Sequence, residues 1–548
     1  MRLPTRIFVP GLLLLALLVI GVFAPVTHFE FVRWDDDNNF TQNSMLTEPW
    51  SLALAKKMFT ADRALRFEPV QWLCCRVVYA AAGFEPGVWH AVGLSWHVLA
   101  TLLFAVALRQ FLRRIDPAAG SRADLLALLG AAMWGVHPLR AETVGWVTAS
   151  TYPLAGVFLL ASFVCYQQAG ESGRRSLAWL GSSWVLAVLG YASYPVGVTY
   201  GLWLVVYDLW RNRRGLGAAD PRRWRWWAKH ALFLLPAVLA VAVTVWSRYA
   251  DPGIFSEAPN LATTGLPARL VMALAGMAAL AWSLVWPVQL SPNRPPLHIE
   301  AAGTLPLVLL AALAAVVALL AAWQGRKRWP GLALVVFGFA GLSIPCLGLT
   351  ERPTWPVDRY SYLVHLILIG GAATLVLRWT ERRLAMIAGI AVLALGTAAV
   401  AARKQTMTWR DSETLFTQMA HDSRFADNPR QQGLVYILWG RYLVVRHDPA
   451  RAAEMLNRAQ HVYLQAISDA LAHEDYPEAL GLLSHEEHYF GLTPILRREK
   501  GAWLLRLHRP LDALRELRRA DAALPGDPRT QTLLQQATNA ALSAAHTH

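Results

Sequence analysis

Three adjacent aspartates follow the first long apolar stretch of the chain. Asp35, Asp36 and Asp37 come directly after Trp34 and before two asparagines. Neighbouring carboxylates repel one another to an extent set by their burial. Carboxylates can also take a proton from a hydroxyl group or hold a divalent cation. The triplet is therefore a candidate for base or metal chemistry, and a solvated acidic loop with Asn43 capping a helix is the alternative.

Two further polar motifs place arginine beside an acid. One contains His137, Arg140 and Glu142 within six residues, and the other contains Asp358 next to Arg359. Such groups at membrane depth cost free energy unless they are paired or used. Either guanidinium can bind a phosphate or an anionic headgroup. The alternative for each motif is that its charged residues pair with one another.

Apolar stretches that can cross a bilayer must position these motifs. The chain has 548 residues, of which 55% are hydrophobic and 16% charged, whereas soluble domains carry about 25% charged residues. About eleven stretches before residue 403 approach the roughly 20 apolar residues that a spanning helix needs. The first, from Ile7 to Val26, is long and lacks a cleavage site, so we expect a retained helix. The formal net charge is +14, and the Lys and Arg residues cluster in short loops between the apolar stretches. This pattern is typical of residues that set membrane orientation, and we expect no nucleic-acid partner.

The positive-inside rule predicts eleven crossings, with the N-terminus in the cytoplasm and the C-terminus outside. The stretch 268–289 does not fit this count, so we expect it to be re-entrant or interfacial, with Trp282 and Trp286 at the interface. The predicted outer segments are 28–68, 137–142, 350–359 and everything after residue 402. The predicted crossing helices span about 7–27, 90–108, 123–136, 144–166, 177–193, 196–209, 230–247, 304–323, 331–349, 360–377 and 384–402.

Other reactive residue types are expected to serve packing. Buried, hydrogen-bonded roles are predicted for the histidines His90 and His97 and for Arg66, and the cysteines show no metal-binding spacing. A Gly-rich phosphate loop, H-E-x-x-H and G-x-S-x-G are all missing from the sequence, which argues against a P-loop ATPase, a zincin or an ordinary α/β-hydrolase. The four cysteines are Cys74, Cys75, Cys165 and Cys346.

Residues 403–548 become amphipathic and helical. The segment Glu499–Pro528 fits a helix-turn-helix repeat of about 34 residues, and a looser unit covers Gly433–Leu464. We expect two or three tetratricopeptide-like (TPR-like) units stacked into a short solenoid that binds a peptide or a partner protein. A packing lid over the membrane domain is the alternative.

Four motifs in this order resemble a known family. W-D-D-D before N at 34–38, H-P-L-R-A-E-T-V-G-W-V from 137, D-R-Y-S-Y-L from 358 and W-R-D-S-E-T-L-F from 409 are similar to motifs of the transmembrane-and-TPR proteins. These are related to protein O-mannosyltransferases and share the GT-C glycosyltransferase fold. The resemblance runs from about residue 28 to the C-terminus. It implies an all-α protein, with a GT-C-like transmembrane domain over 1–402 and a TPR-like extracytoplasmic domain over 403–548.

The resemblance implies a polyprenyl-phosphate-linked sugar as donor. It makes Asp35 and Asp36 the candidates for the catalytic base or a metal-linked acid, and the metal, if there is one, would lie among Asp35, Asp36 and Asp37. Arg359 becomes the candidate for the donor phosphate. The implied donor- or acceptor-binding residues are His137, Arg140, Glu142, Asp358 and Arg359.

Two departures from the family pattern concern charge. Many relatives carry a charged R-K-D or R-x-E stretch where this chain has 149–153, A-S-T-Y-P, and they often carry Ser-Lys-Pro where it has Ser193, Tyr194 and Pro195. Two charges expected near the reaction centre are therefore missing, so that either the donor differs or activity has been lost.

The resulting hypothesis is a glycosyltransferase of the bacterial inner membrane. It would move a sugar from a polyprenyl-phosphate carrier to a protein or glycan acceptor on the extracytoplasmic face, and Asp36→Asn should abolish transfer without harming folding. One alternative is a non-catalytic envelope-assembly scaffold that depends on 404–548. The other is a lipid-linked glycan transporter, which would need charged residues deep inside several spans.

Overall fold

The protein is described by a computed structural model, and the regular elements of its described residues are all helices. The chain divides into two compact units, Met1–Leu415 and Phe416–His548. The first unit continues past the predicted domain end at residue 402. The described residues are 8–60, 66–169, 173–216, 220–250, 265–288, 290, 304–349, 356–379, 381–422 and 428–545.

Long apolar helices build the first unit. Their bounds are α1 Phe8–Phe23, α5 Pro86–Ile115, α6 Gly120–Gly135, α8 Thr151–Gln168, α9 Arg174–Ser193, α10 Tyr200–Arg213, α11 Trp224–Ala250, α12 Leu266–Ser283, α13 Thr304–Gly325, α14 Pro330–Ser343, α15 Ser361–Leu377 and α16 Glu381–Thr406. Shorter helices join them: α2 Ser44–Thr47, α3 Leu52–Phe59, α4 Pro69–Ala82 and α7 Ala141–Gly145.

Nine helices in the described part of the chain are long and apolar enough to cross a membrane. The prediction of a helical integral membrane protein is therefore confirmed. The nine include Leu266–Ser283, which overlaps the stretch 268–289 that the loop charges had left without a crossing. Residue 289 lies outside the described residues. The shorter α6, α10 and α14 pack beside these helices. The count of eleven crossings and the orientation stay predictions.

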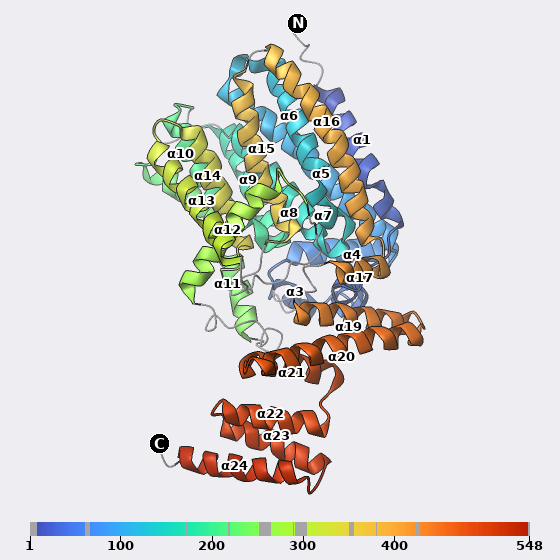
Figure 1. The fold of residues 1–548 in the computed structure, drawn as a ribbon. Coiled ribbons are helices and arrows are strands. Elements are labelled where there is room, and N and C mark those ends of the chain that lie inside the picture. The colour runs from blue at the N-terminus through green and yellow to red at the C-terminus, as the bar shows by residue number, and fades with distance from the viewer. Residues whose placement is uncertain are drawn as a thin grey trace. The chain divides into compact units, whose positions relative to one another are not determined.

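Close packing of α5, α6 and α15 forms the centre of the first unit, with α1 and α16 alongside (Figure 1). A Cβ atom on Gly135 would lie 2.8 Å from Thr101 Cγ2, so glycine permits the close approach of α5 and α6. The His97 ring bonds with the Tyr362 hydroxyl at 2.9 Å and with the Gly135 carbonyl oxygen at 2.8 Å. His97 thus joins three helices, as its predicted core role required.

His90 and the four cysteines were also predicted to be packed in the core. His90 is buried and lies 3.3 Å from the Glu30 carbonyl oxygen, which agrees with a hydrogen-bonded core histidine. Cys75 and Cys346 are buried, whereas Cys74 and Cys165 are half-buried, and no disulfide joins these four described cysteines.

The second unit consists of antiparallel helices joined by short turns. Proline stands in the first turn of each of the first five, where its missing N–H costs nothing. Asn428, Asp448, Asp475 and Thr493 cap four helix N-termini through their side chains. The helices are α19 Pro429–Val445, α20 Pro449–Ala472, α21 Tyr476–Phe490, α22 Pro494–Arg506, α23 Pro510–Ala523 and α24 Pro528–Ala545.

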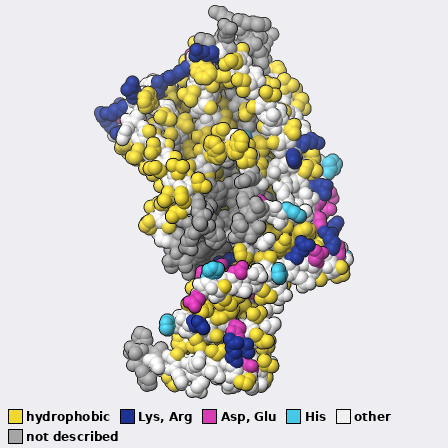
Figure 2. Space-filling model, viewed as in Figure 1, with side chains coloured by type: hydrophobic (Ala, Val, Ile, Leu, Met, Phe, Trp, Pro, Cys, Tyr) yellow, Lys and Arg dark blue, Asp and Glu magenta, His cyan; other side chains and the backbone are white. Residues whose placement is uncertain are grey.

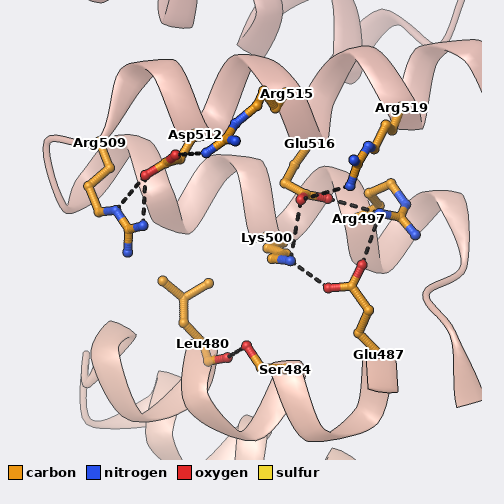
Figure 3. Close-up of polar contacts among 10 residues, drawn as sticks. All are labelled: Leu480, Ser484, Glu487, Arg497, Lys500, Arg509, Asp512, Arg515, Glu516 and Arg519. Carbon is orange, nitrogen blue, oxygen red and sulfur yellow. Dashed lines mark hydrogen bonds and ion pairs between the residues drawn. The ribbon is translucent and has the colours of Figure 1, made fainter. Parts of the chain in front are cut away.

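A network of charged side chains joins α21, α22 and α23 of this unit (Figure 3). Arg497 lies 3.1 Å from Glu487 and 3.0 Å from Glu516, and Lys500 contacts the same two carboxylates. Gly501 lets α22 and α23 meet, because a Cβ there would lie 2.5 Å from Leu517. Helical hairpins of this kind suit the predicted repeats, and the TPR assignment itself stays a prediction.

Candidate active site

The loop that carries the three aspartates is held by the last residues of the first unit. The backbone N–H of Glu30 donates to the Arg410 carbonyl oxygen at 2.9 Å, and that of Arg33 donates to Ser412 Oγ at 2.9 Å. Both contacts come from the W-R-D-S motif, nearly four hundred positions away in the sequence. Apolar packing supports the loop from below, since Phe40 is buried against Trp89 at a ring separation of 4.9 Å.

A pair of stacked tryptophans sets the position of that motif. The rings of Trp146 and Trp409 lie 5.2 Å apart and are nearly parallel at 11°. Gly145 leaves the necessary space, because a Cβ there would lie 3.0 Å from the Cβ of Trp409. The second and fourth motifs are thereby packed together beneath the acidic loop.

The carboxylate of Asp36 is buried and fully engaged. One oxygen accepts from the backbone N–H and the hydroxyl of Thr148 at 3.0 and 2.7 Å, and the other accepts from the backbone N–H of Val32 at 3.0 Å. Burial raises the pKa of Asp36 to about 7, and these hydrogen bonds oppose the rise. Asp36 therefore ties the loop to the segment that follows α7, a structural task that the sequence did not predict.

Asp37 and Asp35 differ from Asp36 and from each other. Asp37 forms an ion pair with Arg33 at 3.3 Å near the surface. Asp35 is half-buried, and none of the described residues donates a hydrogen bond to its carboxylate. Burial raises the pKa of Asp35 to about 6, while the nearby positive charges of Arg66 and Arg359 oppose that rise. Asp35 is thus a carboxylate with a raised pKa near two arginines. A shifted pKa of this kind is common among catalytic residues.

The predicted second and third motifs pair with each other rather than internally. Glu142 accepts from the backbone N–H of Arg359 at 2.6 Å and also pairs with its guanidinium. Glu142 is buried whereas the Arg359 side chain keeps 21% of its surface exposed. The guanidinium also lies over the Trp146 ring, 5.3 Å from its centroid. Arg359 is therefore held in place on two sides and still has N–H groups open to an anion.

Arg140 and His137 lie away from this arginine. Arg140 is fully buried and donates to Ser361 Oγ at 2.7 Å, with His365 Nδ1 at 3.3 Å. Its Nε and Nη1 atoms have no partner among the described residues. The His137 ring lies 3.1 Å from the Leu284 carbonyl oxygen, which places it against the end of α12. Both residues hold α15 and α12 in position around the site.

The described residues contain no group of three or more His, Cys, Asp and Glu side chains placed to hold a metal. Asp36 and Asp37 turn to Thr148 and Arg33, so the three adjacent carboxylates do not converge. The divalent-cation hypothesis stays a prediction. Predicted outer residues 350–355 lie outside the described part of the chain.

The sequence did not identify several residues as members of the site. Thr148 binds Asp36, Trp146 supports Arg359, and Trp409 packs against Trp146. Their motifs were recognised, although nothing in the local sequence indicates that they meet. Arg66, expected to serve packing, instead lies close enough to Asp35 to influence its pKa.

Comparison with known proteins gives limited similarity. No family model matches the chain. A stretch of 113 residues, 21% of this chain, is 26% identical to the protein O-mannosyl-transferase TMTC3 of Mus musculus and covers 11% of that protein's length. The structure is similar to that of ArnT from Cupriavidus metallidurans bound to undecaprenyl phosphate, with a TM-score of 0.37 and 15% identity over 90% of this chain and 79% of the other. The sequence match agrees with the O-mannosyltransferase-related family that the motifs indicated.

Proposed function

We propose that the protein is a membrane glycosyltransferase of the GT-C type. It moves a sugar from a polyprenyl-phosphate carrier to a hydroxyl group of a protein or glycan acceptor on the extracytoplasmic face. Asp35 is the base, and Arg359 binds the donor phosphate. The motif order and the match to an O-mannosyl-transferase support this class of reaction.

One observation carries the proposal: a carboxylate that accepts no hydrogen bond from the described residues lies near a partly exposed, firmly oriented guanidinium. Asp35 has its pKa raised to about 6 by burial, and Arg359 is near enough to oppose this rise. Glu142 and Trp146 hold Arg359. A base with a pKa near the working pH and a cation for the leaving group are the two groups that transfer from a sugar phosphate requires.

The reaction follows from these positions. The acceptor oxygen attacks the anomeric carbon as its proton passes to Asp35, and a new C–O bond forms. The bond between the anomeric carbon and the phosphate oxygen breaks, and the lipid phosphate leaves with the electron pair. Arg359 offsets the charge that grows on this phosphate, which is where a fixed cation contributes most.

A transfer assay with the purified chain and labelled polyprenyl-phosphate sugars tests the proposal. Arg359→Gln should lower the rate by about 10²–10³-fold, as the loss of one charge-stabilising donor usually does, and Arg359→Lys should restore part of it. Arg33→Gln is the matched control, because Arg33 lies in the same region but pairs with Asp37 at the surface. Equal rates for wild type and Arg359→Gln would refute the assignment.

The second unit is proposed to present the acceptor or an assembly partner. A scaffold without catalysis would depend on residues 416–548 and be indifferent to Arg359. Deleting that unit should lower transfer to a protein acceptor and leave transfer to a small soluble hydroxyl acceptor within a few-fold of wild type.

A further inference from the structure

An apolar cavity of about 660 Å³ lies in the first unit and begins about one helical turn from Arg359. Helices α5, α8, α10, α14 and α15 line this partly open cavity with side chains such as Phe111, Leu160, Trp203 and Leu366. This volume falls in the roughly 300–1,000 Å³ range of small-molecule sites. Most of the lining side chains between the helices are apolar, and the charged ones lie at one end, so the part of the occupant between the helices must be largely hydrocarbon.

The cavity runs along α15 toward the end of the bundle opposite Arg359. Its lining includes Leu363, about one turn after Arg359, and continues to Arg378. At a rise of about 1.5 Å per residue these two lining residues lie ~22 Å apart along the helix. This length exceeds the ~15 Å depth of one leaflet of a bilayer, which is enough for an acyl chain.

Three arginines line the cavity at that far end. They are Arg214, Arg328 and Arg378, and all three are exposed. No ion pair joins them to an acid within the described part of the chain, and Arg328 lies 5.4 Å from the centroid of the Trp329 ring. Figure 2 shows Lys and Arg side chains gathered where Figure 1 places α10, α13 and α14, above a hydrophobic surface. Uncompensated positive charge beside hydrocarbon is the pattern that anionic lipid headgroups complement.

We propose that this cavity binds an acyl chain of an anionic phospholipid whose phosphate contacts Arg214, Arg328 and Arg378. The phosphate position is separate from that proposed for the donor: about 19 residues, ~28 Å along the helical chain, separate Arg359 from Arg378. The lipid fills space between helices that would otherwise leave apolar walls uncovered, and it stabilises the packing of α10, α14 and α15.

Native mass spectrometry of the full chain released from detergent tests this site. Wild type titrated with phosphatidylglycerol should retain one tightly bound copy, and phosphatidylcholine should bind far more weakly. The triple variant Arg214→Gln, Arg328→Gln, Arg378→Gln should bind phosphatidylglycerol on the order of 100-fold more weakly, since each arginine near an anionic lipid contributes a factor of about five.

Two further variants distinguish lipid binding in the cavity from attraction of the lipid to positive charge elsewhere on the surface. Arg174→Gln, Arg175→Gln, Arg222→Gln removes three exposed arginines that do not line the cavity and should keep wild-type affinity. Ala372→Trp adds bulk to the lining and should expel the lipid while the arginines remain.

Three results would overturn the proposal: equal binding of the two phospholipids, equal loss in both triple variants, or no effect of Ala372→Trp. A polyprenyl phosphate that displaces phosphatidylglycerol at equal concentration would also overturn it, because the cavity would then serve the carrier. The transfer assay reports on Arg359 independently, so failure of either proposal leaves the other standing.

Discussion

Replacing Asp35 by asparagine is the most direct perturbation of the proposed reaction. The change keeps the size of the side chain and removes its ability to take a proton. No described residue donates a hydrogen bond to this carboxylate, so the fold should survive. Loss of a general base costs about 10²–10⁴-fold in rate, and we expect Asp35→Asn to fall within this range in the transfer assay with labelled donor.

The pH dependence of the transfer rate gives a second quantitative prediction. Burial raises the pKa of Asp35 from 3.8 to about 6, and a base must be ionised to act. Activity should therefore be lost as the pH falls through about 6. At pH 5 roughly one Asp35 in ten is ionised, so the rate should be about tenfold lower than at pH 7, with no such step in Asp35→Asn.

The control for this experiment is Asp37→Asn. Asp37 lies on the same loop and pairs with Arg33, both side chains being partly exposed, and ion pairs that remain in contact with water contribute little, so the rate should stay within a few-fold of wild type. A flat rate between pH 5 and pH 7, or an Asp35→Asn variant that is as active as Asp37→Asn, would refute the assignment of the base.

Three further predictions concern the contacts that hold the site and the second unit. Asp36→Asn should lower the free energy of unfolding by about 1–3 kcal/mol, because its amide would face the Val32 N–H that the carboxylate now accepts; thermal unfolding in detergent measures this. Trp409→Ala should cost about 3–5 kcal/mol by removing the ring stacked on Trp146, seen in the same assay and as loss of transfer. Glu516→Gln should weaken the α22–α23 pairing by about 1.5–3 kcal/mol, measured by faster amide hydrogen exchange in the full chain.

Two of these predictions have an outcome that would contradict them. Glu454→Gln removes an exposed pair with Arg458 and should leave exchange unchanged, so equal effects of the Glu454 and Glu516 variants would contradict the network in Figure 3. An Asp36→Asn variant with wild-type stability and no transfer would restore the earlier expectation that Asp36 is the base.

Helical periodicity and apolar length were enough to predict most of the elements. The expected helices near 90–108, 304–323 and 360–377 correspond to α5, α13 and α15. In lipid, the backbone N–H and C=O groups of a long apolar run find their hydrogen-bond partners within a helix. Loop charges were less informative, since they left out of the count the helix Leu266–Ser283, which is long and apolar enough to cross a membrane. The positive-inside rule assigns each crossing from the side on which the previous helix ended, so one wrong assignment changes the side predicted for every later segment.

Local sequence determined which residues carry charge, and it predicted that several motifs share one face of the membrane. It could not distinguish Asp35 from Asp36, because the distinction rests on Thr148, more than a hundred positions away. Nor could it show that Glu142 pairs with Arg359 instead of staying within its own motif. Only the folded chain decides these matters: burial and hydrogen bonding set the state of a carboxylate, and both come from segments that are distant in sequence and adjacent in space.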